Sequence, residues 1–560
     1  MKFSQMPYAR PDIDGTQRSL AALIDAFERA GTPSDAIDAY MSADRFIENL
    51  GTMGALASIR HSIDTTNEFF QDEQSYFDEI EPLLQEPLKR LERALLRSPH
   101  RAALEQKFGE LMFKNIEISL KTFDPAIISD LQRENKLTTE YDKLLASAQI
   151  AFDGKPLTLA QISPYLENPD RNVRRAACDA RSAWFSAQAD KFDSLYDELV
   201  GLRTGIAKKL GYENYVELGY YRMTRNCYDR KMVADFREGV RRHIVPVAAR
   251  LKKEQAARIG VPALKVYDDA LIFPEGNAKP FGTPEDIFAH GRRMYHELSP
   301  ETGEFIDFML ENELFDVLTR PGKSGGGYCA YIPDYKSAFI FANFNGTSGD
   351  VDVLTHEAGH AFNAHMIRDR SPSPLRECTY ETAEVHSMSM EFFTWPWMEG
   401  FFSDAGKYRR QHLGDALTFI PYGTMVDEFQ HHVYENPGMT PGERNALWKE
   451  LEGVYRPWLD LRDTAFFEEG RRWQYQAHIY ERPFYYIDYC LAQTVALSFW
   501  SEAQKDHAAA WEKYLKFIDC SGKLTFTESI GVCGLKSPFD PEMMGTVAAA
   551  AAKWLDEQQP

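Results

Sequence analysis

Five consecutive residues, His356-Glu-Ala-Gly-His360, have the types and the spacing that metal-dependent hydrolysis requires. Two histidines four residues apart lie on the same face of an α-helix, one turn from each other. At that spacing both imidazoles can bind one zinc ion, and Glu357 is close enough to act as a base on a water molecule at the metal. The alternative interpretation is a pair of surface histidines on a helix, and the surrounding residues decide between the two.

The residues before the motif predict a strand followed by a helix. The segment 337–344 is rich in aromatic and β-compatible residues and ends at Asn345-Gly346, a turn signal. Thr347 and Asp350 stand three apart as a candidate capping box that opens a helix. We expect this helix to be amphipathic and to carry the zinc motif on a sheltered face.

A catalytic zinc site needs a third protein ligand and an open position for water. Metallopeptidases with the pattern His-Glu-x-x-His-x-x-Gly-x-x-His take a third histidine from the same segment. That class is excluded here, because Asn363 and Met366 occupy its glycine and histidine positions. His365 is about 140° around the helix from His360, which fits a surface or supporting position better than a ligand.

The third ligand is therefore expected from a second helix farther along the chain, where several glutamates occur. Glu384, Met388 and Glu391 share one helix face in an apolar, methionine-rich segment. Burying two carboxylates is costly unless each has a partner. Both carboxylates would have a partner if Glu384 bound the metal and Glu391 formed a hydrogen bond with a ligating histidine. The alternative is a solvated acidic face made of Glu381, Glu384 and Glu391.

These motifs together resemble the M3 family of zinc oligopeptidases, most widely its bacterial oligoendopeptidase branch. The resemblance rests on the zinc motif, on Ala383-Glu384-Val385 and on Glu391, and it extends from about residue 218 to residue 539. Thermolysin-type enzymes carry an acidic residue where Met388 stands, and the Gly-x-Met-Glu-Asn segment of aminopeptidases does not occur. The resemblance implies an endopeptidase with one zinc ion per chain, bound by His356, His360 and Glu384, with Glu357 as general base.

A tyrosine-rich segment begins at His478 and could supply donors for the oxyanion that forms during peptide hydrolysis. Tyrosines in such clusters are usually core residues. However, Tyr486 and Tyr489 are three apart on a predicted helix and would present their hydroxyls to one side. The resemblance implies that this segment faces the zinc helix and that His478 and Tyr489 bind the scissile carbonyl. The other contacting tyrosine is expected to be Tyr486, with Tyr485 and Tyr480 as alternatives.

Composition limits the partners of the chain and its location. The 560 residues carry 63 basic and 84 acidic side chains, a net charge of −21, which argues against binding nucleic acid or anionic membranes. Seven scattered cysteines without a Cys-x-x-Cys pair are typical of a reducing compartment and exclude a cysteine-based zinc site. No run of 18 apolar residues occurs, at the N-terminus or elsewhere. We therefore expect a soluble cytoplasmic protein.

Helical periodicity dominates the chain. It predicts helices over 16–31, 34–62, 65–98, 100–121, 125–147, 170–210 and 230–259, and over nearly everything after 348. A glycine-rich turn at 322–327 leads to a predicted hairpin over 331–344, whose edge strand could pair with an extended peptide. A second hairpin is expected at 150–159, with Asp153-Gly154 at its turn.

The predicted fold is therefore mainly α, with a small β-sheet beside the zinc helix. An N-terminal helical region, 1–190, and a zinc peptidase catalytic region, 191–560, are expected, with a soft boundary that allows each lobe to contain parts of both halves of the sequence. Two helical lobes around a deep substrate channel are what the resemblance adds.

The function predicted from these features is zinc-dependent hydrolysis of internal bonds in short peptides. Two other functions stay open at this point: a zinc carboxypeptidase or dipeptidase of related architecture, and a non-catalytic helical protein that binds peptides. The oligomeric state cannot be read from the sequence.

Overall fold

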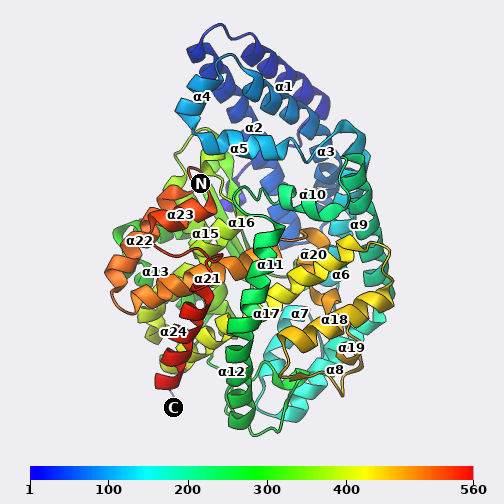
Figure 1. Ribbon diagram of the computed structural model, residues 1–560, viewed down its shortest axis with the longest axis vertical. Coiled ribbons are helices and arrows are strands. Elements are labelled where there is room, and N and C mark those ends of the chain that lie inside the picture. Colours follow the sequence, from blue (N-terminus) through cyan, green and yellow to red (C-terminus); the bar gives the residue numbers. More distant parts are fainter. Residues whose placement is uncertain (559–560) are drawn as a thin grey trace.

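The computed structural model describes residues 1–558, and helices joined by short loops account for most of them (Figure 1). The first helices project from one end of the molecule: α1 (Ile13–Glu28), α2 (Pro33–Ile63), α3 (Glu68–Arg97), α4 (Arg101–Phe108) and α5 (Glu110–Ser119). Four helices and one hairpin follow: α6 (Ile128–Ala146), β1 (Ile150–Phe152), β2 (Lys155–Leu157), α7 (Leu159–Ile162), α8 (Arg171–Ala187) and α9 (Ala189–Lys209).

The middle of the chain adds five helices and most of the remaining strands. They are α10 (Tyr215–Arg222), α11 (Arg230–Gly239), α12 (Val245–Arg258), β3 (Leu264–Lys265), α13 (Pro284–Leu298), α14 (Pro300–Glu311), β4 (Phe315–Leu318), β5 (Tyr328–Ile332) and β6 (Ser337–Phe344).

The remainder is helical apart from one short strand. It comprises α15 (Gly349–Ile367), α16 (Tyr380–Phe393), α17 (Ala405–Glu435), α18 (Pro441–Tyr455), β7 (Leu459–Asp460), α19 (Ala465–Glu468), α20 (Ala477–Glu481), α21 (Tyr486–Ala503), α22 (His507–Cys520), α23 (Phe526–Val532) and α24 (Met543–Glu557). The mainly α fold predicted from the sequence is thus confirmed. Within residues 1–558 no helix combines the length and the apolar character needed to cross a membrane.

The predicted helices and hairpins agree with the structure except where backbone conformation interrupts a periodic segment. The helix expected over 100–121 is two helices, because Gly109 between them has a φ of 87°. The hairpin at 150–157 has left-handed residues at both turn positions, with φ of 52° at Asp153 and 74° at Gly154. Those angles are the ones that a two-residue Asp-Gly turn favours.

A three-stranded sheet of order β4-β6-β5 supports the motif helix α15. The central strand β6 runs parallel to β4 and antiparallel to β5, and almost all its residues are buried. Helix α15 contacts both β6 and β5. Since β5 pairs with a neighbour on one side only, it is an edge strand of this sheet, as the sequence predicted for the hairpin over 331–344.

The start of α15 differs from the expected capping box. The Asp350 carboxylate accepts the backbone N–H groups of Asn345 and Gly346, at 2.8 Å each, and the Thr347 hydroxyl donates to the Asn345 side chain. The predicted Thr347–Asp350 capping box is therefore wrong, because both side chains stabilise the turn that precedes the helix. The expected amphipathic character is wrong as well, since α15 is buried on most sides.

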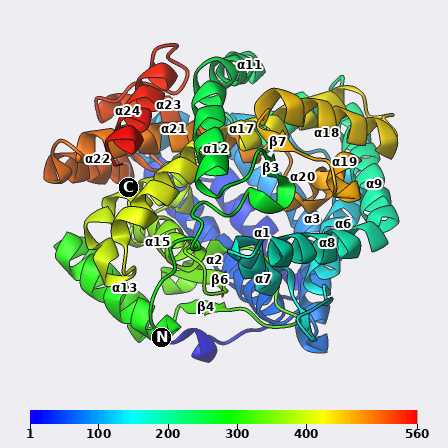
Figure 2. The same ribbon diagram turned by 90° about the horizontal axis from the view of Figure 1, so that it is seen from below.

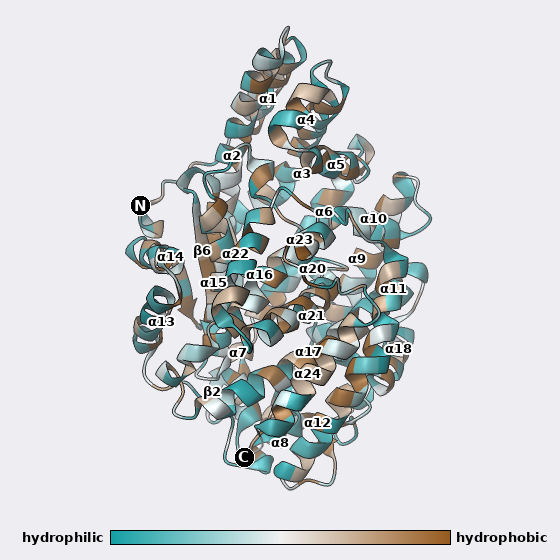
Figure 3. Ribbon diagram, turned by 60° about the vertical axis from the view of Figure 1, so that its left-hand side comes forward, coloured by the Kyte–Doolittle hydropathy of each residue, from teal (hydrophilic) through white to brown (hydrophobic). Residues whose placement is uncertain are grey.

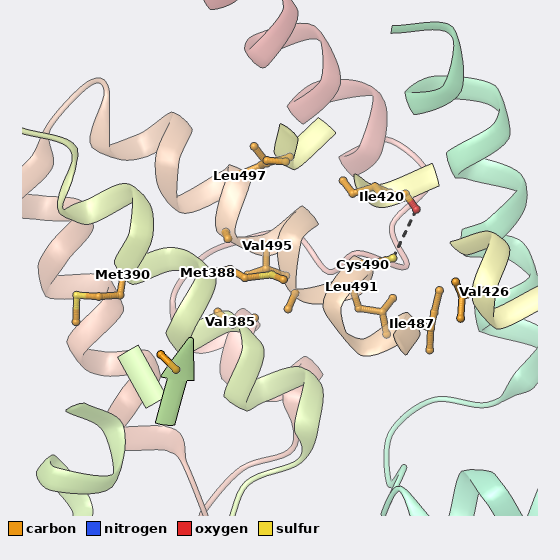
Figure 4. Close-up of a cluster of buried hydrophobic side chains, with 14 of the residues drawn as sticks. Val385, Met388, Met390, Ile420, Val426, Ile487, Cys490, Leu491, Val495 and Leu497 are labelled. Carbon is orange, nitrogen blue, oxygen red and sulfur yellow. Dashed lines mark hydrogen bonds between the residues drawn. The ribbon is translucent and has the colours of Figure 1, made fainter. Parts of the chain in front are cut away.

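Helices α15, α16 and α21 form the centre of the core. Figure 4 shows Val385 and Met388 of α16 beside Leu491 and Val495 of α21, and these side chains are nearly or fully buried. The hydropathy colouring of Figure 3 shows apolar residues along α21, whereas peripheral helices such as α1 and α4 alternate between apolar and polar residues. Burial of this apolar surface fixes the positions of the helices that carry the motif residues.

Elements from both halves of the sequence lie side by side. Helix α6 contacts α20, and α9 contacts α17. Seen from below, α8, α9 and α18 lie on one side of the molecule and α13, α15 and α22 on the other, with α12 between them (Figure 2). The boundary at residue 190 and the deep channel stay predictions.

Candidate metal centre

Three side chains from two helices converge on one point. The Nε2 atoms of His356 and His360 lie 3.2 and 3.5 Å from the Oε2 atom of Glu384. One donor atom from each residue lies within 4.8 Å of the others, as one shared cation would require. Two imidazoles and one carboxylate with an open fourth position are the ligand set of a catalytic zinc site. The three residues that the sequence singled out are thus adjacent in space.

Gly359 lets α15 and α16 approach closely enough for this arrangement. A Cβ atom at position 359 would lie 2.6 Å from the backbone oxygen of His386 and 2.6 Å from the Cα of Ser387. Any side chain there would push the backbone of α16 away. Glu384 stands within one turn of this contact, so its reach to both histidines depends on the missing side chain.

Glu391 fixes the orientation of His356 from the side opposite Glu384. Its Oε1 lies 2.6 Å from His356 Nδ1, which leaves His356 Nε2 for a metal. Its Oε2 lies 2.7 Å from Nε2 of His412 on α17. The indole N–H of Trp395 donates to His412 Nδ1 at 3.1 Å. Because an indole N–H can only donate, His412 carries its proton on Nε2 and donates it to Glu391.

Glu357 is buried between the motif helix and the start of β5. Its side chain is 6% exposed, and its Oε2 has no hydrogen-bond partner within residues 1–558. Burial raises the pKa of this carboxyl, and the neighbouring His356 and His360 oppose the shift. A carboxylate with a raised pKa and a free oxygen accepts a proton at neutral pH better than an ordinary surface glutamate does.

The charge of this cluster calls for a cation. Glu357, Glu384 and Glu391 lie together at the two histidines, and over residues 1–558 no lysine or arginine forms an ion pair with any of them. The partners of Glu384 and Glu391 are His356, His360 and His412, which counter their charge only when protonated. A buried carboxylate without a counter-charge costs several kcal/mol, as an order of magnitude. A divalent cation at the ligand cluster would neutralise most of that charge, so the donor set fits a metal chemically as well as geometrically.

The protonation of His478 is set by a chain of hydrogen bonds. The Tyr422 hydroxyl donates to Gln476 Oε1 at 2.7 Å, and Gln476 Nε2 donates to His478 Nδ1 at 3.0 Å. His478 therefore carries its proton on Nε2, which lies 3.3 Å from the Tyr489 hydroxyl. Burial lowers the pKa of His478 to about 4, so the ring is neutral at physiological pH.

The tyrosines around His478 occupy different positions. The rings of Tyr485, Tyr486 and Tyr489 all contact the His478 ring, with centroids 4.8 to 5.7 Å away. The Tyr485 hydroxyl donates to Glu384 Oε1, which links this segment directly to the ligand cluster. Tyr480 instead stacks on Tyr141 in the core, with ring centroids 3.9 Å apart.

Two buried arginines hold the segment that carries His478 and these tyrosines. Arg203 donates to the backbone oxygens of Ile479 and Tyr480 and is paired with Glu134 at 2.6 Å. Arg225 donates to the backbone oxygen of Phe484. Phe484 has a φ of 68°, an unfavourable conformation for an aromatic residue. The surrounding contacts therefore impose the turn that precedes Tyr485.

Two sequence interpretations are corrected by the structure. Glu381 and Glu384 are 0% and 1% exposed, so the solvated acidic face is wrong. The expected surface or supporting position of His365 is wrong too, because this residue is buried against the rings of Phe305 and Phe308.

Several residues that contact the predicted site residues were not singled out from the sequence, among them His412, Gln476 and Ser387, whose hydroxyl donates to Glu384 Oε2 at 3.0 Å. Tyr485, expected only as an alternative to Tyr486, is the tyrosine that contacts Glu384. The only local signal was the position of Gln476 two residues before His478. The roles of Tyr486 and of the other predicted residues stay predictions.

Comparison with known proteins finds related peptidases. The family model described as "Peptidase M3 N-terminal domain" matches residues 3–123, and "Peptidase family M3" matches residues 164–540. The oligopeptidase PepF of Bacillus subtilis is 20% identical over 521 residues, which cover 86% of this chain and 74% of that protein.

Solved structures with the same overall fold are more similar in sequence. The structure of Pz peptidase A with an inhibitor is 47% identical, covers 100% of both chains and has a TM-score of 0.98. A structure provisionally named as an oligoendopeptidase F is 50% identical, covers 99% of both chains and also has a TM-score of 0.98.

The close contact at Gly359 predicts a specific metal-binding defect. Replacing Gly359 with Ala should lower the affinity for Zn²⁺ by about 10- to 100-fold, because α16 must move and carry Glu384 away from the histidines. Calorimetric titration of the metal-free protein measures this change. Gly201→Ala, at a helix position with nothing within 4 Å of the added carbon, is the matched control. A folded Gly359→Ala protein with unchanged affinity would contradict the proposed geometry.

Proposed function

The chain belongs to peptidase family M3, and we propose that it is a zinc-dependent metalloendopeptidase that hydrolyses internal bonds of short peptides. The observation that carries this proposal is the cluster of His356, His360 and Glu384, with the buried Glu357 beside it. Among the relatives, an oligopeptidase and a peptidase solved with an inhibitor support the choice of peptides as substrates.

The proposed ligands are His356, His360 and Glu384, with one zinc ion per chain. When bound, zinc supplies Lewis acidity, which makes a water molecule acidic enough to ionise near neutral pH and polarises the scissile carbonyl. Glu391 holds the ring of His356 through Nδ1 and so keeps Nε2 directed at the metal position. Tyr485 restrains Glu384 through its Oε1, so both types of ligand are oriented by a second contact.

Glu357 is proposed to move the proton in this reaction. Its unpartnered Oε2 accepts a proton from the attacking water and then delivers it to the amine of the leaving peptide. The raised pKa that burial causes favours the first transfer, because it makes the carboxylate a stronger base.

His478 and Tyr489 are proposed to donate hydrogen bonds to the oxyanion that forms on the scissile carbonyl. The neutral His478 ring presents Nε2–H, and the Tyr489 hydroxyl lies 3.3 Å from that nitrogen, so one oxygen atom can accept from both. Donors held in place before the reaction stabilise the transition state without reorganisation. The backbone of edge strand β5 would orient an extended substrate independently of its sequence.

A cytoplasmic location is also proposed. All seven cysteines are unpaired in the structure, four of them buried. Free thiols in this number persist in a reducing compartment.

Glu357→Gln should retain zinc and lose nearly all turnover. Glutamine keeps the size and the hydrogen bonds of glutamate but cannot accept the proton. The assay is cleavage of a quenched fluorescent peptide with both ends blocked, which only an endopeptidase cleaves. Zinc content measured on the same sample is the control. If the Glu357→Gln protein keeps more than about 1% of the wild-type activity, Glu357 is not the general base. If the wild-type protein leaves the blocked peptide uncleaved, the proposed endopeptidase activity is refuted.

Tyr489→Phe should lower kcat and kcat/KM together by about 100-fold with little change in KM, as expected when one transition-state donor is lost. Steady-state kinetics on the same peptide measures both constants. Tyr480→Phe, which removes the hydroxyl of a core tyrosine, is the matched control and should have normal kinetics. A raised KM with intact kcat would make Tyr489 a ground-state peptide contact instead.

A further inference from the structure

A cavity of about 310 Å³ lies next to the proposed metal centre but is separate from it. Its walls come mainly from the N-terminal helices α2, α3 and α5 and from residues 373–380, which lead into α16. Figure 1 shows α2 and α5 above α16. Tyr380 lines the cavity, and its ring contacts the ring of Tyr485 at 4.7 Å between centroids. Since Tyr380 precedes Glu384 by about one helical turn, the cavity lies within a few substrate residues of the ligand cluster.

The cavity combines apolar walls with acidic groups. Leucine, isoleucine and methionine side chains from α2, α3 and α5 line one part of it, namely Ile47, Leu88, Leu91, Leu95, Met112 and Ile116. Asp44, Glu92 and Glu377 are the charged residues that line it, and no lysine or arginine is among the lining residues. One nearby cation already pairs with a lining residue, because Lys89 Nζ lies 3.0 Å from Glu92 Oε1. Arg376 pairs with Glu48, which is outside the cavity.

Two polar atoms that line this cavity, the Tyr40 hydroxyl oxygen and Oε2 of Glu92, have no hydrogen-bond partner within residues 1–558. Tyr40 is 4% exposed, its ring packs against Phe27 and Phe108, and its hydroxyl makes no hydrogen bond with any residue of 1–558. The Oε2 atom of Glu92 is buried and equally without a partner in that range. Buried polar groups in folded proteins are nearly always hydrogen-bonded, so both atoms point to a ligand that donates hydrogen bonds.

We propose that this cavity is a substrate subsite for a cationic group on an apolar stem, namely a lysine or arginine side chain or the ammonium of a peptide's N-terminal residue. The apolar walls would contact the stem, and Glu92, Glu377 and the Tyr40 hydroxyl would accept hydrogen bonds from the charged end. Burial, followed by the charge of Asp44, raises the pKa of Glu377, and a bound cation would relieve that cost. The inference rests on the proposed peptidase function, since it names a class of substrate.

The test compares peptides that differ only in charge at one position. Pairs of end-blocked fluorogenic peptides carry Lys or the uncharged Met at each position flanking the cleaved bond, and a further pair compares a free with an acetylated N-terminus. With the wild-type protein, we expect the cationic peptide of one pair to have a kcat/KM about 10-fold higher than the neutral peptide of the same pair. In the double variant Glu92→Gln/Glu377→Gln that ratio should fall to about 1. The pair that loses its preference distinguishes a side chain from a terminal ammonium.

Two further variants make the test robust. Glu86→Gln removes one charge from an exposed position of α3 outside the cavity and should keep the wild-type ratio. Glu377→Gln alone breaks no ion pair within residues 1–558 and should lower the ratio by about 3-fold even if the double variant folds poorly. The proposal would be overturned if Glu377→Gln and the double variant both kept the wild-type preference for the cationic peptide. It would also be overturned if the wild-type protein showed no such preference at any position.

A binding measurement separates this inference from the peptidase function itself. Calorimetric titration of the Glu357→Gln protein with the same peptides needs no turnover. If the wild type cleaves none of the peptides but the Lys form still binds about 10-fold more tightly than the Met form, the endopeptidase proposal fails and the subsite stands. Equal affinities for the cationic and neutral peptides would overturn the subsite whatever the enzyme cleaves.

Discussion

Where α15 meets α16, Gly359 leaves no room for a side chain, and Glu384 reaches His356 and His360 only because the two backbones touch there. A carboxylate on one helix and two imidazoles on another must agree within a few tenths of an ångström to share a cation. The sheet behind α15 and the apolar contacts of α16 with α21 keep the two helices in register. The small sheet and the large helical core therefore both hold α15 and α16 in a fixed position relative to each other.

Charge is the second constraint on this region. Buried arginines from the α9–α10 region hold the backbone of the segment that bears His478 and Tyr489, and chains of hydrogen bonds set the protonation of His478 and His412. Every one of these polar groups is costly to bury unless its partner is in place. Distant parts of the chain thus determine the geometry at the metal position. The same logic applies to the neighbouring acidic cavity, where the Oε2 atom of Glu92 has no hydrogen-bond partner within residues 1–558.

Local sequence patterns predicted most helices and the strand before the motif, because each depends on periodicity over a few residues. The ligand set of His356, His360 and Glu384 was implied by the family resemblance. Contacts between distant segments could not be predicted in this way. His412 lies on a different helix from Glu391, and no spacing links them. Tyr485 rather than Tyr486 reaches Glu384, because α21 begins only at residue 486 and the left-handed Phe484 sets the direction of the chain before it. Gly359 is an ordinary helix residue until α16 is packed against it.

The identity of the third ligand is the central claim, and one metal titration tests it most directly. Glu381 and Glu384 lie on the same helix and are both buried. Glu384 contacts both histidines, whereas neither carboxylate oxygen of Glu381 has a hydrogen-bond partner within residues 1–558. Calorimetric titration of metal-free Glu384→Ala and Glu381→Ala proteins with Zn²⁺ compares them under identical conditions. The account predicts a severe loss of zinc affinity in Glu384→Ala and near wild-type affinity in Glu381→Ala. The reverse order would assign the ligand to Glu381 and contradict the account, and equal losses would mean that α16 itself had been disturbed.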